Sequence, residues 1–311
     1  MKILKPPRLR HGDIIGIVAP SSTPRDFTSL ENGIRYLEKN GYRVDVAQNI
    51  SHRYGYLAGT DEVRASELNA MFRNKKIKAI FVARGGYGIH RILTKIDYAL
   101  VRRNPKIVVG YSDVTALQMA LWKNCNLVSL SAPLVVEFAE KLTGKQEEIF
   151  WQLLTTPTMK NITYDVRGTF CNIIHEKKNI TGRIIGGNLS LFSTLCGTPF
   201  FPSLHNSIFY CEDIGEAPYR IDRMLHQLKL AKVFKDTAGI VLGNFTDCDA
   251  LNENSLTLTQ VFSDVFSDVQ RSVVSGLQYG HCKESVAIPI GVRGKIHFQK
   301  KKLQLLESVV E

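Results

Sequence analysis

The sequence lacks the features that mark several broad classes of protein. None of its 311 residues lies in an apolar stretch as long as a transmembrane helix, so we expect no membrane-spanning segment. The six cysteines form no C-x-x-C pair and have no framework spacing, which predicts isolated, mostly buried thiols in a reducing compartment. There is also no H-E-x-x-H segment, so we predict neither a metal ion nor any other cofactor.

The N-terminal segment does not have the pattern of a secretory signal. Basic residues precede an apolar stretch at 14–20, but that stretch is too short for a signal h-region. It also follows Asp13 and lacks a small-residue cleavage site. We therefore expect the protein to be cytoplasmic.

Positive charge exceeds negative charge, but it is scattered. The 40 Lys and Arg residues against 29 Asp and Glu residues leave a net charge of +11. Apart from short runs such as 300–302, no basic stripe with interleaved aromatic residues occurs. We therefore predict no nucleic-acid partner, and interpret the excess as a basic surface that can favour capture of an anionic substrate.

Strand and helix patterns alternate over the first 120 or so residues. Short apolar runs predict strands at 13–19, 42–46, 78–83 and 106–109, with a helical pattern between each pair. Alternation of this kind predicts an α/β fold with a parallel sheet and right-handed crossovers. Loops with a functional role then gather at the carboxyl ends of the strands.

The rest of the chain is organised differently. At 44% hydrophobic content the chain can bury a large core, and we predict two domains, at 1–136 and 181–311. The periodicity blurs between them, so 137–180 is predicted to be a connecting segment. The second domain is predicted to be α/β with short strands, including a two-stranded ribbon at 291–306, and a helix that starts at Pro218.

Ser112 occupies a predicted turn from a strand to a helix. It follows the apolar run at 106–109 and Gly110, and apolar residues at helical spacing begin at Val114. A serine on such a turn can act as a nucleophile, with helix N–H groups, including that of Asp113, near a developing oxyanion. The pattern departs from G-x-S-x-G because Val114 replaces the second glycine. Taken alone, it favours a serine that only caps the helix.

A glycine-rich loop follows the predicted strand at 78–83. In Arg84-Gly85-Gly86-Tyr87-Gly88 the glycines permit positive φ and close approach of the backbone, as an oxyanion-binding N–H or an anion-binding loop requires. The spacing of a dinucleotide-binding loop is absent. An ordinary tight turn is an equally good interpretation.

A nucleophilic serine requires a base and an acid that orients the base. Among the eight histidines, His281 stands out because Gly280 precedes it and a predicted strand approaches it. His90 and His226 fall on predicted helices. Glu212 lies at the end of a predicted strand, although a surface ion pair would explain it equally well. Spacing alone does not bring these groups together with the serine.

Segments along nearly the whole chain match a known family in order, and the stretch from 137 to 181 matches least. On these segments the chain resembles the LD-carboxypeptidase family of serine peptidases, which includes muramoyltetrapeptide carboxypeptidases and microcin C self-immunity peptidases. The matching segments are 12–21 (GDIIGIVAPS), 54–61 (YGYLAGTD), 83–88 (ARGGYG), 110–117 (GYSDVTAL), 186–189 (GGNL), 212–223 (EDIGEAPYRIDR), 280–281 (GH) and 289–292 (PIGV).

The resemblance implies a fold and a catalytic triad. The N-terminal parallel-sheet domain would be similar to class I glutamine amidotransferases, and the smaller C-terminal α/β domain would be of a swivelling type. Ser112, Glu212 and His281 would form the triad, each in its matching motif. A homodimer is also implied by the resemblance.

The implied activity is cleavage of murein tetrapeptides in cell-wall recycling. Members of the family cut between the L-centre of a diamino acid and a terminal D-alanine, through an acyl-enzyme. For this reaction we expect the backbone N–H groups of Asp113 and Gly86 to bind the oxyanion. Arg84 and Gly85 are expected to contact the substrate, although Arg84 is as well suited to bracing its own loop.

Two alternatives remain open. The first is the same peptidase chemistry on a peptidyl-nucleotide antibiotic, as in the microcin branch, although the 84–88 loop matches the murein branch better. The second is a non-catalytic peptide-binding or nucleic-acid-binding protein, suggested by the net charge of +11. A glutaminase is less suitable, because Cys would stand at Ser112.

Overall fold

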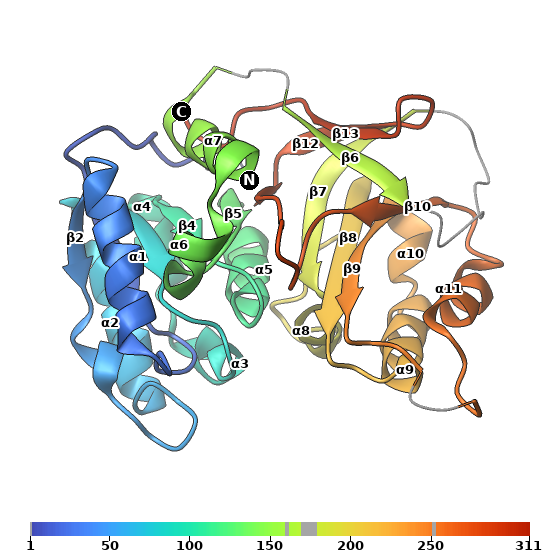
Figure 1. Ribbon diagram of the computed structural model, residues 1–311, viewed down its shortest axis with the longest axis horizontal. Coiled ribbons are helices and arrows are strands. Elements are labelled where there is room, and N and C mark those ends of the chain that lie inside the picture. The colour runs from blue at the N-terminus through green and yellow to red at the C-terminus, as the bar shows by residue number, and fades with distance from the viewer. Residues whose placement is uncertain (1, 159–161, 169–178, 251–252) are drawn as a thin grey trace. The chain divides into compact units, whose positions relative to one another are not determined.

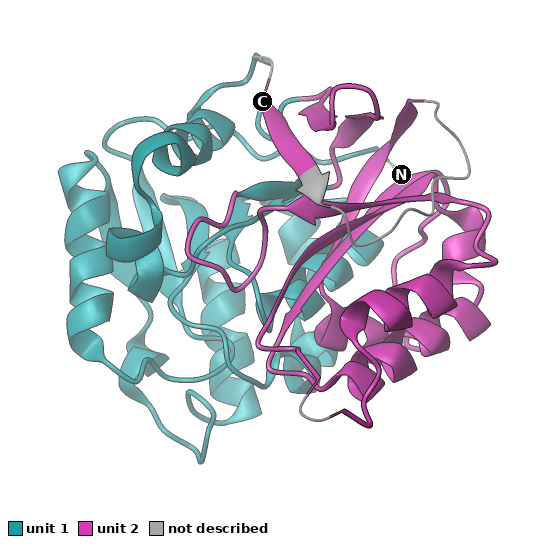
Figure 2. Cartoon of the chain, turned by 45° about the vertical axis from the view of Figure 1, so that its right-hand side comes forward, with its two compact units in different colours: residues 1–158, 287–290, 308–311 teal, residues 159–286, 291–307 magenta. Residues whose placement is uncertain are grey.

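The computed structural model describes residues 2–158, 162–168, 179–250 and 253–311. The chain forms two compact units, shown in different colours in Figure 2. Unit 1 contains 1–158, 287–290 and 308–311, and unit 2 contains 159–286 and 291–307. Part of the predicted connecting segment, 159–161 and 169–178, lies outside the described residues.

A six-stranded sheet forms the centre of unit 1, in the order β11-β5-β4-β3-β1-β2 (Figure 1). All neighbours are parallel except β11, which is antiparallel to β5. Apolar β-branched residues fill strands such as β4, since a parallel sheet is covered on both faces. The strands are β1 (Ile14–Val18), β2 (Arg43–Val46), β3 (Ile77–Val82), β4 (Ile107–Val109), β5 (Ser129–Ser131) and β11 (Ile288–Ile290).

Helices cover both faces of this sheet. Helix α1 contacts α6, whereas α2, α4 and α5 form a second contacting group. Two groups are expected because the chain runs outward from β1 in both directions, and right-handed crossovers in opposite directions place their helices on opposite faces of the sheet. The predicted helix that carries His90 is α-helical only from Ile89 to Ile92 and continues as a 3₁₀ turn at 93–95. Asp97 then caps the next helix by accepting from Leu100 N. The helices are α1 (Phe27–Lys39), α2 (Asp61–Arg73), α3 (Ile89–Ile92), α4 (Tyr98–Arg103), α5 (Val114–Cys125), α6 (Phe138–Lys141) and α7 (Gly144–Thr155).

Unit 2 is built on a closed barrel, in the order β10-β6-β13-β12-β7-β8-β9. Closure leaves no unpaired sheet edge, since β6 pairs with both β10 and β13. β7, β8, β9 and β10 run parallel, and the remaining pairs are antiparallel. The strands are β6 (Thr163–Gly168), β7 (Ile180–Asn188), β8 (Ser207–Ile214), β9 (Gly239–Thr246), β10 (Ser272–Leu277), β12 (Arg293–His297) and β13 (Lys302–Leu305).

In the described part of unit 2, four helices accompany the barrel, and the predicted two-stranded ribbon is present as β12 and β13. The ribbon turns at the lysine run, where Lys301 has φ +49°, while Gly294 pairs with Leu305 inside the ladder. Pro218 is the first residue of its helix, as predicted. The helices are α8 (Leu189–Thr194), α9 (Pro218–Leu230), α10 (Val233–Asp236) and α11 (Leu258–Phe266).

The two units do not coincide with the predicted boundaries at 136/137 and 180/181. Helices α6 and α7 belong to unit 1, where Phe138 and Phe150 pack edge-to-face on Phe81 of β3. The apolar residues of α6 and α7 repeat over only a few helical turns. A pattern this short does not distinguish a helix of the domain from a connecting segment. Strand β11 also returns to unit 1, because residues 288–290 pair with β5.

Most of the cysteines in the described residues are buried and none of them forms a disulfide bond, as the sequence predicted. Cys125, Cys211 and Cys248 are buried, and Cys196 and Cys282 are partly exposed. Cys171 lies outside the described residues. No helix in the described ranges has the combined length and hydropathy needed to cross a bilayer.

Candidate active site

Ser112 lies on a strained turn between β4 and α5. Its φ is +64°, a left-handed conformation that non-glycine residues seldom adopt and that is found at the nucleophile turn of strand-turn-helix hydrolases. The N-cap of α5 is Asp113, and no side chain caps the helix, so Ser112 does not have the helix-capping role that its pattern favoured. Strained residues of this kind cluster at active sites, so the backbone makes Ser112 a candidate functional residue.

The glycine loop after β3 passes directly against Ser112. A Cβ at Gly85 would lie 3.3 Å from Ser112 Oγ and 3.2 Å from its Cβ, so a larger residue there would crowd the serine. Gly86 has φ +111°, and a side chain on it would collide with Ser22 Oγ. The two loops that the sequence singled out in unit 1 therefore lie side by side.

Asp113 joins this loop to the serine turn. Its side chain is 1% exposed, and Oδ2 accepts a hydrogen bond of 3.1 Å from Ile89 N at the start of α3. Burial raises the pKa of this carboxyl to about 6, although the bond from Ile89 N opposes the shift. The side chain thus holds the glycine loop in place, and its charge is costly in this position.

Because the buried charge is costly, we predict a pH-dependent difference in the free energy of unfolding between the wild type and Asp113→Asn. The folded pKa of about 6 exceeds the ordinary aspartate pKa of 3.8, so the folded state binds the proton more tightly and loses stability as pH rises from about 4 to 6. Relative to the variant, the wild type should lose about 3 kcal/mol of unfolding free energy over this range. Urea unfolding at several pH values measures the difference.

The same substitution at exposed Asp45 controls for loss of a negative charge. A difference between wild type and Asp113→Asn that is constant from pH 4 to pH 7 would contradict the raised pKa of Asp113.

In unit 2, Glu212 and His281 form a hydrogen-bonded pair. Glu212 is fully buried in β8, and its Oε2 lies 2.9 Å from His281 Nδ1 and accepts a bond of 3.1 Å from His281 N. A carboxylate can only accept, so Nδ1 carries the proton and Nε2 of the neutral ring is the basic nitrogen. This is the orientation that a general base needs.

Asn188 completes the environment of Glu212, although its sequence pattern did not predict a role at the site. It ends β7 directly opposite Glu212 in the parallel ladder. Its Nδ2 donates to Glu212 Oε1 at 3.1 Å and to Asp213 Oδ1 at 3.0 Å, while its Oδ1 caps α8. Burial raises the pKa of Asp213. An asparagine between a buried strand and a helix start was the available signal.

Gly280 allows the histidine turn to pass close to Glu212. Its φ is +122°, and a Cβ on it would lie 2.5 Å from Glu212 Oε2. Gly280→Ala is therefore expected to displace the carboxylate from His281 and to cost about 1–3 kcal/mol of backbone strain. Denaturant unfolding and peptidase assays would measure both effects.

Gly197→Ala is the matched control, since Gly197 also has positive φ, +86°, but its Cβ would meet nothing within 4 Å. It should lose stability through strain alone and keep full activity. Equal effects of the two substitutions on activity would show that the contact at Gly280 is unimportant.

The other candidate groups have simpler explanations. His226 is exposed on α9 and bonds to Asp222 at 2.8 Å, and His90 lies on α3, where burial lowers its pKa. Burial raises the pKa of Cys211 well above its usual value, so this thiol is not activated. Within the described ranges, no three His, Cys, Asp or Glu side chains are grouped to bind a metal ion.

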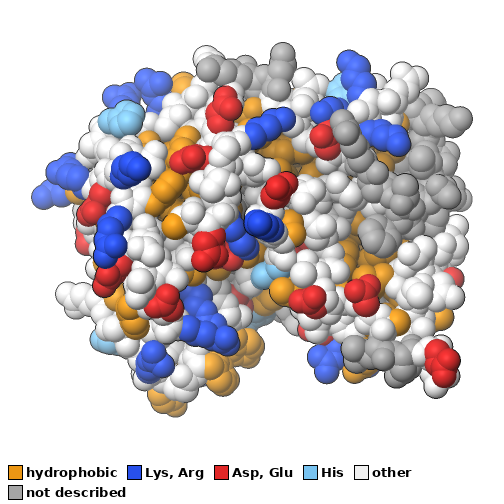
Figure 3. Space-filling view, viewed as in Figure 1, with side chains coloured by type: hydrophobic (Ala, Val, Ile, Leu, Met, Phe, Trp, Pro, Cys, Tyr) orange, Lys and Arg blue, Asp and Glu red, His pale blue; other side chains and the backbone are white. Residues whose placement is uncertain are grey.

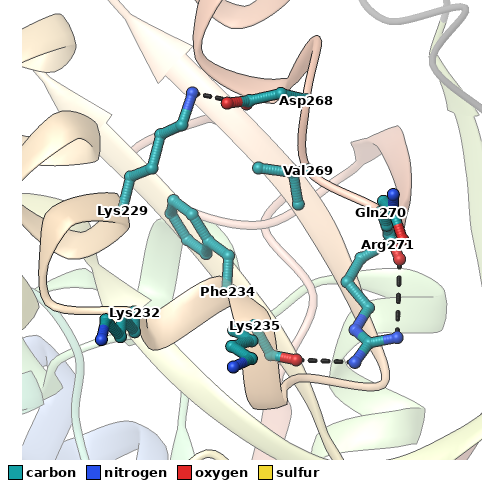
Figure 4. Close-up of a pocket in the computed structure, with 8 residues that line it drawn as sticks. All are labelled: Lys229, Lys232, Phe234, Lys235, Asp268, Val269, Gln270 and Arg271. Carbon is teal, nitrogen blue, oxygen red and sulfur yellow. Dashed lines mark hydrogen bonds and ion pairs between the residues drawn. The ribbon is translucent and has the colours of Figure 1, made fainter.

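Unit 2 contains a cavity of about 370 Å³, and Figure 4 shows the residues that line it. Lys229 pairs with Asp268 across it, and Arg271 donates to the Lys235 carbonyl. Lys235 and Arg271 precede β9 and β10, so the cavity is at the amino ends of the parallel strands. Glu212 is near the carboxyl end of β8, and the cavity therefore does not belong to the histidine pair.

Comparison with known proteins identifies the family. Residues 15–132 match the LD-carboxypeptidase N-terminal domain, and residues 181–296 match the C-terminal domain. A probable murein peptide carboxypeptidase of Bacillus subtilis is 35% identical over 99% of this chain and 96% of its own.

Solved structures agree in fold. The muramoyltetrapeptide carboxypeptidase of Oxalobacter formigenes has 30% identity and a TM-score of 0.83, covering 94% of this chain and 97% of its own. The microcin C7 self-immunity protein MccF has 25% identity and a TM-score of 0.89, covering 99% and 100%. The strained serine turn, the buried Glu212–His281 pair and these matches lead to one assignment: the chain belongs to the LD-carboxypeptidase family of serine peptidases.

Proposed function

We propose that this serine carboxypeptidase releases terminal D-alanine from murein tetrapeptides. The observation that carries the proposal is the ordered Glu212–His281 pair in a chain that also holds Ser112 on a strained turn. Relatives named for murein peptides support the substrate, among them a murein tetrapeptide carboxypeptidase of Pseudomonas aeruginosa, 28% identical over 89% of this chain and 91% of its own.

In the proposed reaction, Ser112, His281 and Glu212 act as a triad. Ser112 Oγ attacks the scissile carbonyl while Nε2 of His281 accepts its proton, and the imidazolium then protonates the departing D-alanine amine. Water hydrolyses the acyl-enzyme by the reverse proton path. Glu212 stabilises the imidazolium and keeps Nδ1 protonated through the 2.9 Å bond.

The oxyanion is proposed to bind the backbone N–H groups of Asp113 and Gly86. Both belong to the loops that meet at Ser112, and each such donor typically contributes about 2.7–4 kcal/mol to the transition state. Arg84, with Gly85, is proposed to bind the terminal carboxylate. Its Nη1 donates to the Thr23 carbonyl at 2.8 Å, so it also braces the loop, and a guanidinium has further N–H groups for a ligand.

The test is to incubate the purified protein with a murein tetrapeptide and with its L-alanine-terminated analogue, and to quantify released alanine by mass spectrometry. Release from the D-terminated peptide alone is expected. Release from neither peptide would contradict the proposed substrate.

A peptidyl-nucleotide is the second candidate substrate, because the fold matches MccF over 99% of the chain. Cleavage of such a compound in preference to the tetrapeptide would select it. The non-catalytic binding alternative has little support, since basic and acidic side chains are interspersed on the face shown in Figure 3. That alternative expects salt-sensitive binding that Ser112→Ala leaves unchanged.

A cytoplasmic homodimer is proposed as the working form of the enzyme. Light scattering at several protein concentrations tests the dimer, and cell fractionation tests the location.

A further inference from the structure

Unit 1 contains a cavity of about 360 Å³ at a distinctive point of its sheet. The chain runs outward from β1 in one direction to β2 and in the other from β3 to β4 and β5, so the strand order reverses between the adjacent strands β1 and β3. Ligands of open α/β sheets bind at the carboxyl ends of the strands at such a point. The loops that follow β1 and β3 line this cavity, together with Arg53, Gly55 and Tyr56.

Hydrogen bonds between these loops hold the cavity in shape. Ser22 N donates to Gly85 O, and Tyr87 N donates to Ser22 Oγ, both at 3.3 Å. Thr23 Oγ1 donates to His52 O, which ties in the third loop. A cavity whose walls are connected in this way is preformed, so binding need not order its loops.

The cavity and Ser112 lie on either side of one loop. Gly85 is in contact with Ser112, and the next residue, Gly86, lines the cavity against Ser22. A substrate whose carbonyl lies at Ser112 can therefore extend past the glycines into this space.

The charged side chains at the cavity are all arginines. Arg25, Arg53 and Arg84 line it, and none of its lining residues is acidic. Among the described residues, no ion pair includes any of the three. Burial, and then the charge of Arg25, lower the pKa of Arg84, which indicates that the two guanidinium groups repel each other. An anionic ligand would relieve that repulsion.

The number of arginines exceeds what one carboxylate requires. A single guanidinium can bind a carboxylate through two parallel hydrogen bonds, so Arg84 suffices for a terminal carboxylate. Arg25 and Arg53 are then available for a second. Tyr56 and Tyr87, 64% and 51% exposed, meet edge-to-face at the cavity and offer an apolar wall for the carbon chain that carries it.

We infer that Arg25 and Arg53 form a subsite for a second substrate carboxylate, carried by the side chain of the residue whose carbonyl Ser112 attacks. The inference rests on the proposed function and specifies its substrate. The enzyme then selects a diamino acid whose side chain ends in a carboxylate, such as diaminopimelate, over lysine at the third position of the tetrapeptide.

Three tetrapeptides that differ only at the third residue test the subsite: diaminopimelate, its side-chain carboxamide, and lysine. The wild type is expected to show a kcat/KM for the carboxylate peptide at least about tenfold above that for the amide, mainly through KM, since the lost bonds are charge-assisted. In an Arg25→Gln, Arg53→Gln variant the ratio should fall to about one, because only the carboxylate peptide is affected. Arg53→Lys should retain part of the preference.

Arg35→Gln is the control for the loss of one positive charge from the same unit, since Arg35 is exposed on α1 and pairs with Glu31. It should leave the ratio unchanged, and thermal unfolding confirms that each variant folds. Equal cleavage of the three peptides by the wild type would overturn the inference and leave the proposed function intact. A fourth tetrapeptide, amidated at its second residue instead, should be cleaved as well as the diaminopimelate peptide, and an equal loss of kcat/KM for it would also overturn the inference.

Calorimetry with a Ser112→Ala variant separates binding from turnover. If the wild type cleaves no peptide but the Ser112→Ala variant binds the carboxylate peptide more tightly than the amide peptide, the proposed function is contradicted and the subsite is supported. Equal binding of the carboxylate and amide peptides would overturn the subsite.

Discussion

Ser112→Ala is expected to lower kcat by about 10⁴- to 10⁶-fold while the protein remains folded, as in serine peptidases that lose their nucleophile. The substitution removes one oxygen and keeps a Cβ, so the strain of φ +64° is the same in both proteins. Steady-state assays of D-alanine release measure the loss of kcat, and unfolding curves measure the free energy of unfolding.

Ser112→Gly is the matched variant. It also removes the hydroxyl, but glycine adopts positive φ without strain, so the free energy of unfolding should rise by about 1 kcal/mol while activity stays absent. A stable but inactive Gly variant would show that the strained backbone is maintained for the position of the hydroxyl. Substantial D-alanine release by either variant would contradict the nucleophile assignment.

Glu212→Gln is expected to lower kcat by about 10³- to 10⁴-fold. Oε2 accepts from both the backbone N and the ring Nδ1 of His281, and Oε1 accepts from Asn188. A glutamine must turn its NH₂ toward one of these donors. If it faces the ring, Nδ1 has to accept, the proton moves to Nε2, and the base is lost.

The loss of kcat should depend on His281. His281→Ala alone is expected to be about as damaging as Ser112→Ala, and the double variant with Glu212→Gln no worse than the histidine variant, because the residues act as a unit. Additive losses would show that Glu212 acts on the reaction independently of the histidine. A near-wild-type rate for Glu212→Gln would remove it from the triad.

Local pattern was sufficient to predict most elements of unit 1. Buried β-branched runs marked β1, β3 and β4, and a proline at the first helical position marked the start of α9 in unit 2. The prediction was poorer where an element depends on a distant partner. Residues 288–290 form a strand only because β5 offers an edge, and no property of three residues reports that.

By itself, the sequence determined the kinds of chemistry the site contains: a serine on a strand-to-helix turn, glycines after the next strand, and a histidine preceded by glycine. The tertiary structure decided which of these groups touch. It placed Gly85 on Ser112, joined Glu212 to His281 and Asn188, and gathered three arginines from three separate loops into one cavity. The physical reason is that hydrogen bonds and charges act over a few ångströms, whereas the residues that share them are tens of positions apart in the chain.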